Sequence, residues 1–174
     1  MIHGSSIISK KTKIGKNVKI GPFCNIGDFV DLGDNVELIS NVHIEGHTTI
    51  GNGTKIFPFA SIGTTPQDLK FKNEPNSLII GERNTIREYV TINPGTTGGG
   101  GQTTIGNDCL FMISSHVAHD CKIGNNVISN LTIMGNMGRD HKQTIITYCC
   151  LAASTCCSWI YCYIFSNRIS FTYN

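Results

Sequence analysis

Four histidines in this sequence are side chains that could do chemistry. His116 and His119 lie three residues apart within residues 114–121 (SSHVAHDC), and Asp120 follows His119 directly. A histidine of near-neutral pKa can act as a general base toward a hydroxyl, and a neighbouring carboxylate can orient its ring. The same side chains can also bind a metal ion, and His43 and His47 offer two more imidazoles earlier in the chain.

A six-residue repeat must position these side chains. Apolar residues recur at an interval of six from Ile8 to Ile62, from Ile80 to Ile92 and from Ile105 to Ile123. The fifth place of each hexad is mostly small or β-branched, and Gly often follows the apolar residue. This period is typical of a parallel β-helix, in which three hexads of roughly 18 residues form a triangular coil and coils stack about 4.8 Å apart. We therefore predict an all-β fold, a parallel β-helix from about residue 2 to residue 134.

The first and fifth places of each hexad are expected to point into the β-helix. We predict inward side chains at Ile14, Ile20, Cys24, Ile26, Leu32 and Cys121. The four histidines occupy neither place, so they are expected to project outward, which excludes a role as buried core histidines. Because His43 and His47 lie several coils before His119, they are too far along the axis to complete a metal site of three or four ligands. A general base is therefore favoured over a metal ligand, and we expect no metal and no cofactor.

Two interruptions of the repeat predict external loops. Residues 64–78 (TTPQDLKFKNEPNSL) leave and re-enter the repeat in phase, whereas residues 94–102 (PGTTGGGGQ) break the phase. The glycine-rich loop could cradle a phosphate, but it lacks the GK[ST] of a P-loop. A flexible corner hairpin is favoured over a nucleotide-binding loop.

Composition excludes several classes of protein. Hydrophobic residues make up 40% and charged residues 15%, which argues against disorder, and the net charge of +2 is too small for a strongly basic nucleic-acid binder. The N-terminus (MIHGSS) has no secretory-signal pattern, so we expect a cytoplasmic protein. Cys24, Cys109 and Cys121 are far apart in sequence and are expected to be reduced, buried thiols.

Several sequence blocks resemble one family of enzymes. They are residues 20–24 (IGPFC), 59–71 (FASIGTTPQDLKF), 80–92 (IGERNTIREYVTI), 98–101 (GGGG) and 112–126 (MISSHVAHDCKIGNN). Together with the hexads, they are similar to the UDP-N-acetylglucosamine O-acyltransferases that open lipid A biosynthesis in Gram-negative bacteria. Hexads alone are shared by many acyltransferases, whereas QDLK followed by HVAHDC is specific, and the resemblance covers residues 1 to about 136.

The resemblance implies a left-handed β-helix that assembles as a homotrimer with active sites between subunits. It also implies transfer of a 3-hydroxyacyl chain from acyl carrier protein to the 3-hydroxyl of UDP-N-acetylglucosamine, with no nucleic-acid partner and no integral membrane role. His119 matches the general base and Asp120 its orienting partner, while Asp68, Lys70 and His116 match positions that contact the sugar and phosphates.

The sequence departs from the family pattern after this region. A Gly-His pair in the family supplies an oxyanion-hole N–H and a substrate-binding histidine, and the nearest match here is Gly135 followed by Asn136. The family's later coils and its helical C-terminal domain have no counterpart in the sequence. We therefore expect turnover far below that of a full-length relative.

The last residues differ in kind from the rest of the chain. All 19 glycines lie at or before Gly138, no acidic residue follows Asp140, and five of the eight cysteines lie beyond it. Metal binding by the cysteine pairs and a membrane span over residues 144–165 are disfavoured alternatives. The favoured hypothesis is a frameshift near residues 129–138, which divides the chain into an acyltransferase β-helix (1–136) and an aberrant, irregular Cys-rich tail (137–174).

Two interpretations of function remain open. The first is a lipid A acyltransferase, either the O-acyltransferase or the related UDP-3-O-acylglucosamine N-acyltransferase, which QDLK and HVAHDC favour less. The second is a non-enzymatic remnant of the O-acyltransferase that at most binds substrate or trimerises.

Overall fold

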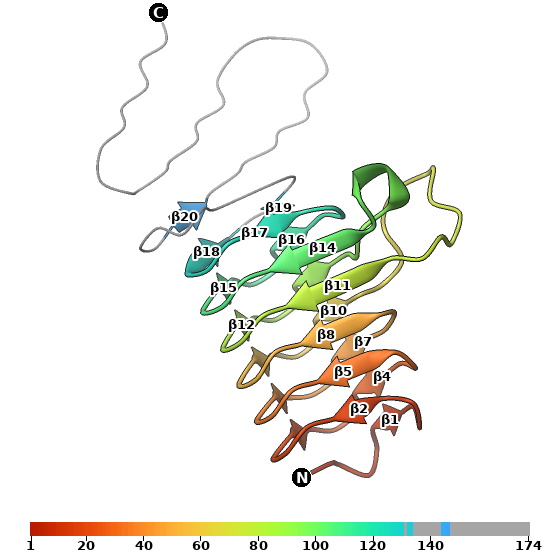
Figure 1. Cartoon of the computed structure of the whole chain (residues 1–174). Helices are drawn as coiled ribbons and strands as arrows, with labels where there is room; N and C mark the ends of the chain where they lie inside the picture. The colour runs from red at the N-terminus through yellow and green to blue at the C-terminus, as the bar shows by residue number, and fades with distance from the viewer. Residues whose placement is uncertain (131, 134–143, 147–174) are drawn as a thin grey trace, which may run out of the picture.

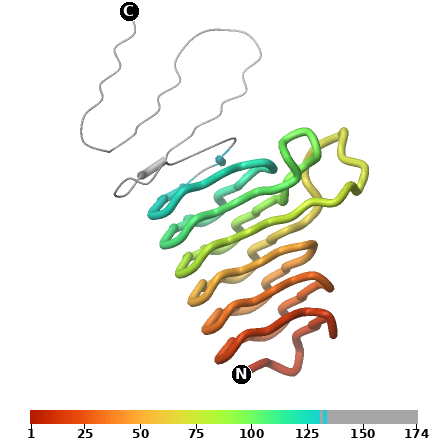
Figure 2. The backbone as a smooth tube through the Cα atoms, viewed as in Figure 1, coloured from red at the N-terminus to blue at the C-terminus, as the bar shows by residue number. Residues whose placement is uncertain are grey.

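The chain folds into a three-sided parallel β-helix (Figures 1 and 2). The structure, a computed structural model, describes residues 1–130, 132–133 and 144–146. Sheet 1 contains β1 (Ile7–Ile8), β4 (Asn25–Ile26), β7 (His43–Ile44), β10 (Ser61–Ile62), β13 (Thr91–Ile92), β16 (His116–Val117) and β19 (Thr132–Ile133). Sheet 2 contains β2 (Lys13–Ile14), β5 (Val30–Leu32), β8 (Thr48–Ile50), β11 (Ser77–Ile80), β14 (Gln102–Ile105) and β17 (Lys122–Ile123). Sheet 3 contains β3 (Lys19–Ile20), β6 (Glu37–Leu38), β9 (Lys55–Ile56), β12 (Thr85–Ile86), β15 (Leu110–Phe111), β18 (Val127–Ser129) and β20 (Thr144–Ile146).

The predicted register is confirmed by the strand pairing. Ile44 lies opposite Ile26 in the coil before it and opposite Ile62 in the coil after it, so like residues stack in rows inside the β-helix. Five of the six side chains predicted to point inward are buried: Ile20, Cys24, Ile26, Leu32 and Cys121. Burial raises the pKa of the Cys24 and Cys109 thiols, which fits reduced cysteines that serve as small apolar residues.

Ile14 differs from this prediction because it is 38% exposed. It pairs with the buried Leu32 and so belongs to the inward row, but β2 is the terminal strand of sheet 2. The hexad position determines the direction of the side chain, whereas a further coil is needed to cover it. The first coil is therefore incompletely buried.

Both external loops leave the β-helix at the corner between sheet 1 and sheet 2 (Figure 1). The first external loop, residues 63–76, connects β10 to β11, and Ile80 re-enters the inward row opposite Ile50, as predicted. The second external loop, residues 93–101, connects β13 to β14 and contains one 3₁₀ turn, η1 (Thr97–Gly99). The four-residue segment 118–121 connects β16 to β17 at the same corner. His119 and Asp120 therefore lie on the same edge as the two loops.

The last coil continues the repeat through a shortened corner. Ser129 pairs with Phe111 and Ile133 pairs with Val117, and both residues are buried, although they are four rather than six positions apart. Residues 144–146 form β20, which pairs in parallel with β18. These residues (TII) are β-branched, a composition that favours strands. Gly135, Asn136 and the cysteine pairs lie outside the described residues.

Candidate active site

His119 and Asp120 form a hydrogen-bonded pair at the corner between sheets 1 and 2. The Nδ1 atom of His119 lies 2.6 Å from Oδ2 of Asp120, and the His119 side chain is 32% exposed. An ionised carboxylate only accepts hydrogen bonds, so Nδ1 must carry the proton in this contact. The Nε2 atom of neutral His119 is then the acceptor, which is the state that a general base requires.

Asp120 is held by residues of the second external loop. The Thr96 backbone N–H donates to Oδ1 of Asp120 at 2.7 Å, and the Thr96 hydroxyl donates to Oδ2 at 2.6 Å. Burial alone would raise the pKa of the Asp120 carboxyl, but the hydrogen bonds from Thr96 and His119 favour its charged form and lower that pKa overall. Asp120 is therefore a carboxylate at neutral pH and can stabilise a protonated His119.

His116 lies on the outer face of sheet 1, in β16, three residues before His119 on the following corner. Its Nδ1 atom lies 2.7 Å from the hydroxyl of Thr91 on the neighbouring strand β13. Burial lowers the pKa of His116, and the nearby His119 adds to this effect. His116 is therefore neutral at pH 7 and can take part in hydrogen bonding with a polar ligand.

Asp68 and Lys70 lie on the first external loop, where a hydrogen bond joins them. The Lys70 backbone N–H donates to Oδ1 of Asp68 at 2.9 Å, in a local turn. In the described part of the chain no hydrogen bond or ion pair joins either side chain to His119 or Asp120. The structure thus places Asp68 and Lys70 on the same edge of the β-helix as His119 and Asp120, but it shows no hydrogen bond or ion pair between the two groups of residues.

The two external loops contact each other and the body of the β-helix. The buried Asn93 side chain donates to the backbone carbonyls of Thr64 at 3.2 Å and Thr65 at 3.4 Å, which anchors the start of the first loop. The Glu74 carboxylate accepts a hydrogen bond from the Lys72 backbone N–H at 2.6 Å and also interacts with Thr97 of the second loop. These contacts, with the backbone bond to Lys72 the largest cause, lower the pKa of Glu74.

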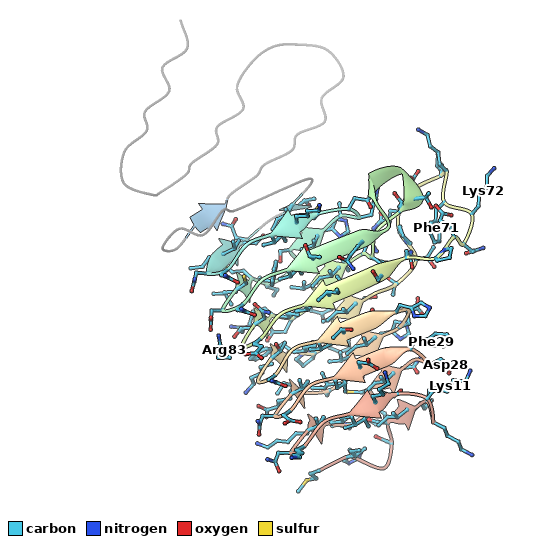
Figure 3. The ribbon with its side chains drawn as sticks, viewed as in Figure 1. Lys11, Asp28, Phe29, Phe71, Lys72 and Arg83 are labelled. Atoms are coloured by element: carbon cyan, nitrogen blue, oxygen red, sulfur yellow. The ribbon has the colours of Figure 1, made fainter. Side chains whose placement is uncertain are left out.

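A hollow of about 420 Å³ lies between the first external loop and the preceding coils, with Phe71, Phe29 and His47 among its lining residues. Figure 3 shows Phe71 and Lys72 on the same side of the β-helix as Phe29 and Lys11. Neither His119 nor Asp120 lines this hollow. The His119–Asp120 pair therefore lies outside this hollow, partly exposed at the corner of the β-helix.

The other two outward histidines take part in separate contacts. His43 lies 3.3 Å from the Glu45 carboxylate, and His47 stacks on Phe29 with ring centroids 4.5 Å apart. None of the four histidines is buried, so the prediction that they project outward is confirmed. Over the described residues, no cluster of three or more His, Cys, Asp or Glu side chains could hold a metal ion.

Thr96, Thr91 and Gly99 are site residues that the sequence analysis did not identify. Thr96 lies 24 residues before Asp120 in the second external loop, and Thr91 lies in the block 80–92, but neither residue type at its place indicated a contact with Asp120 or His116. The run of glycines at residues 98–101 could have indicated a close approach of this loop to the site, although the sequence favours a flexible hairpin there. A Cβ built on Gly99 would lie 1.9 Å from Cγ of Asp120, so this part of the loop packs directly against the site.

No helix in the described ranges is long and apolar enough to cross a membrane.

The profile of the bacterial transferase hexapeptide family (six repeats) matches residues 11–46 and 102–128. The acyl-(acyl-carrier-protein)–UDP-N-acetylglucosamine O-acyltransferase of Paracoccus denitrificans is 64% identical over 83 residues, which are 47% of this chain and 32% of that protein. The enzyme of the same name from Rickettsia felis is 61% identical over 121 residues, which are 70% of this chain and 46% of that protein.

Solved structures agree with these sequence matches. A crystal structure of a UDP-N-acetylglucosamine acyltransferase aligns with a TM-score of 0.74 and 54% identity, over 75% of this chain and 50% of that chain. The Bacteroides fragilis enzyme aligns with a TM-score of 0.75 and 48% identity, over 78% of this chain and 53% of that chain. This chain thus spans about a third to a half of the curated relatives and about half of the solved structures.

The repeat, the three parallel sheets and these matches define the class: the chain is a hexapeptide-repeat protein with a left-handed parallel β-helix, as expected from the sequence, and it is similar to bacterial hexapeptide transferases. Within this class, the matched coils are similar to those of UDP-N-acetylglucosamine O-acyltransferases.

Proposed function

We propose that this protein transfers a 3-hydroxyacyl chain from acyl carrier protein to the 3-hydroxyl of UDP-N-acetylglucosamine, the first step of lipid A biosynthesis. The observation that carries the proposal is the arrangement of His119, whose Nδ1 is bound to a carboxylate and whose Nε2 is free to accept a proton. The relatives at 61–64% identity bear the name of this enzyme.

His119 acts as the general base. Its Nε2 takes the proton of the sugar hydroxyl as the hydroxyl oxygen attacks the thioester carbonyl, while Asp120 stabilises the imidazolium that forms. Collapse of the tetrahedral intermediate breaks the C–S bond, and the imidazolium returns the proton to the departing sulfur. The products are the sugar ester and the free thiol of the carrier protein, and no cofactor is consumed.

His116, Asp68 and Lys70 bind the sugar nucleotide in this proposal. His116 is neutral, partly exposed and lies on β16, the strand that leads directly to His119. Lys70 is an exposed cation that suits a phosphate, and Asp68 suits a sugar hydroxyl. Gly135 is assigned to the oxyanion hole by its match to the family pattern, and it lies outside the described residues.

We further propose that the functional unit is residues 1–136, that it works in the cytoplasm and that it forms a homotrimer. A trimer is supported by the position of the partly exposed His119 at a corner of the β-helix, outside the hollow of a single chain, where a second subunit could complete the site. Mass measurement of the native protein tests the assembly. Reading the gene in its other frames tests whether residues 137–174 are out of frame.

The activity is tested with purified protein, UDP-N-acetylglucosamine and a 3-hydroxyacyl carrier protein. We expect His119→Ala to reduce turnover by about 10²–10⁴-fold, the usual contribution of a general base. His43→Ala is the matched control, because His43 is an outward histidine like His119 but lies on β7, where its ring faces the Glu45 carboxylate at 3.3 Å. Binding of the sugar nucleotide without any turnover would instead support a non-enzymatic remnant, and acylation of an amino sugar would support the N-acyltransferase.

A further inference from the structure

The second external loop contains a turn, residues 96–101, that contacts Asp120. The turn consists of threonine and glycine only, so none of its side chains titrates near neutral pH. We propose that Thr96 and Gly99 of this turn are positioning residues, which fix the Asp120 carboxylate and, through it, the protonation pattern of the His119 ring. The inference rests on the proposed function, in which His119 is the general base.

Thr96 fixes both oxygens of the carboxylate. Its backbone N–H donates to Oδ1 at 2.7 Å and its hydroxyl donates to Oδ2 at 2.6 Å, so the carboxylate plane cannot rotate without breaking one of the two bonds. Thr96 is itself rigidly placed, because it is only 3% exposed and its carbonyl accepts bonds from the N–H groups of Gly99 and Gly101. Internal hydrogen bonds therefore hold the turn in place, and Thr96 donates two hydrogen bonds from it to Asp120.

Gly99 allows the turn to approach Asp120 this closely. A Cβ at Gly99 would lie 1.9 Å from Cγ and 2.2 Å from Oδ2 of Asp120, far inside van der Waals contact. A Cβ at the neighbouring Gly98 would meet nothing closer than the Thr96 hydroxyl at 4.0 Å. Gly98 and Gly99 are adjacent in the same turn, but only a Cβ at Gly99 would collide with Asp120.

The consequence for His119 follows from the shared oxygen. Oδ2 of Asp120 accepts both the Thr96 hydroxyl and Nδ1–H of His119, so the direction in which the histidine proton points depends on where Thr96 holds that oxygen. The hydrogen bond at one ring nitrogen decides which tautomer is present. A carboxylate that is free to rotate would allow the Nε2–H tautomer, which cannot accept a proton from the sugar.

The test compares Thr96→Val, which removes only the hydroxyl, with Thr96→Ser, which restores it. The readout is the ¹⁵N NMR spectrum of the His119 ring in the full chain, recorded at a pH where the spectrum no longer changes on adding base and assigned with His119→Ala. We expect Thr96→Val to convert part of His119 from the Nδ1–H to the Nε2–H tautomer and to lower kcat by about 10²-fold, with little change in KM for the sugar nucleotide. Thr96→Ser should restore both, and Thr85→Val, on the outer face of sheet 3, should change neither.

A second, independent test compares substitutions at Gly99 and Gly98. Gly99→Ala should shift the His119 tautomer and lower kcat as Thr96→Val does, whereas Gly98→Ala should match the wild type. If Thr96→Val does not fold by circular dichroism, the glycine pair decides the question.

The inference is overturned if His119 keeps the wild-type tautomer in both Thr96→Val and Gly99→Ala. It is also overturned if Gly98→Ala shifts the tautomer as much as Gly99→Ala, because the effect would then belong to the turn in general. A tautomer shift in a protein with no acyltransferase turnover would support the positioning role and refute the proposed function, so the two outcomes are distinguishable.

Discussion

Replacing Asn84 by valine should destabilise the protein, although the repeat favours valine at that place. Asn84 occupies the fifth place of its hexad, which holds valine at Val36 and Val127 in the same corner of the β-helix. It is 1% exposed, and its Nδ2 donates to the carbonyls of Gly81 and Gly106, both at 2.9 Å. Its Oδ1 accepts from the Cys109 backbone N–H at 2.8 Å. The side chain thus satisfies backbone groups of two successive coils.

The size of the effect follows from counting the groups that lose their partner. The Gly81 carbonyl also accepts from the Thr54 hydroxyl at 3.2 Å, so it keeps one hydrogen bond. The Gly106 carbonyl and the Cys109 N–H lose the bonds that Asn84 supplies, and each buried group left unpaired costs about 1–3 kcal/mol. The valine methyls recover about 1 kcal/mol through apolar contact. We expect a net loss of about 1–5 kcal/mol in the free energy of unfolding.

Asn84→Thr is the matched control, because Thr54 already shows what a threonine does one coil earlier. The Thr54 hydroxyl donates to the Gly81 carbonyl and accepts from the Asn84 N–H at 3.3 Å. A threonine at position 84 can make the same pair of bonds to Gly106 and Cys109, so we expect a loss below about 1 kcal/mol. Urea denaturation followed by far-UV circular dichroism measures both variants. The reasoning is refuted if Asn84→Val is as stable as the wild type, or if Asn84→Thr is as unstable as Asn84→Val.

Three further predictions concern the core, a tight corner and the pH dependence of stability. Phe111→Ala should cost about 3–5 kcal/mol in a denaturant titration, because Phe111 is fully buried, and a loss under about 1 kcal/mol would contradict the assigned packing. Gly51→Ala should lower Tm by more than Gly4→Ala, since a Cβ at Gly51 would lie 2.4 Å from the backbone of Gly81 whereas Gly4 has open space around it. Burial lowers the pKa of His116, so the unfolded chain takes up this proton first as pH falls below about 6.5, and the folded state loses stability from there down to the native pKa. NMR titration of His116 should give a pKa below 6.5, and a higher value would show that the ring is solvated.

The repeat and the His119–Asp120 pair were predictable because both are local in sequence. Each coil makes the same contacts as the one before it, so a period of six is enough to indicate which side chains stack as Ile26, Ile44 and Ile62 do. Adjacent residues on a short corner remain neighbours in any fold of that corner. The sequence also indicated which histidines project outward, because the hexad position determines the direction of a side chain.

The environment of that pair depended on the tertiary structure. Thr96 and Asp120 are 24 residues apart, and the turn that joins them leaves the repeat, so no periodicity relates the two. Position in the hexad likewise could not show that Ile14 is exposed, because the exposure of a residue on a terminal strand depends on what covers the end of the β-helix. Nor could it show that Asn84 satisfies backbone groups of two coils, because the hydrogen bonds at each corner depend on how successive coils are stacked. Local pattern determines where a side chain points, whereas contacts between distant segments determine what it meets there.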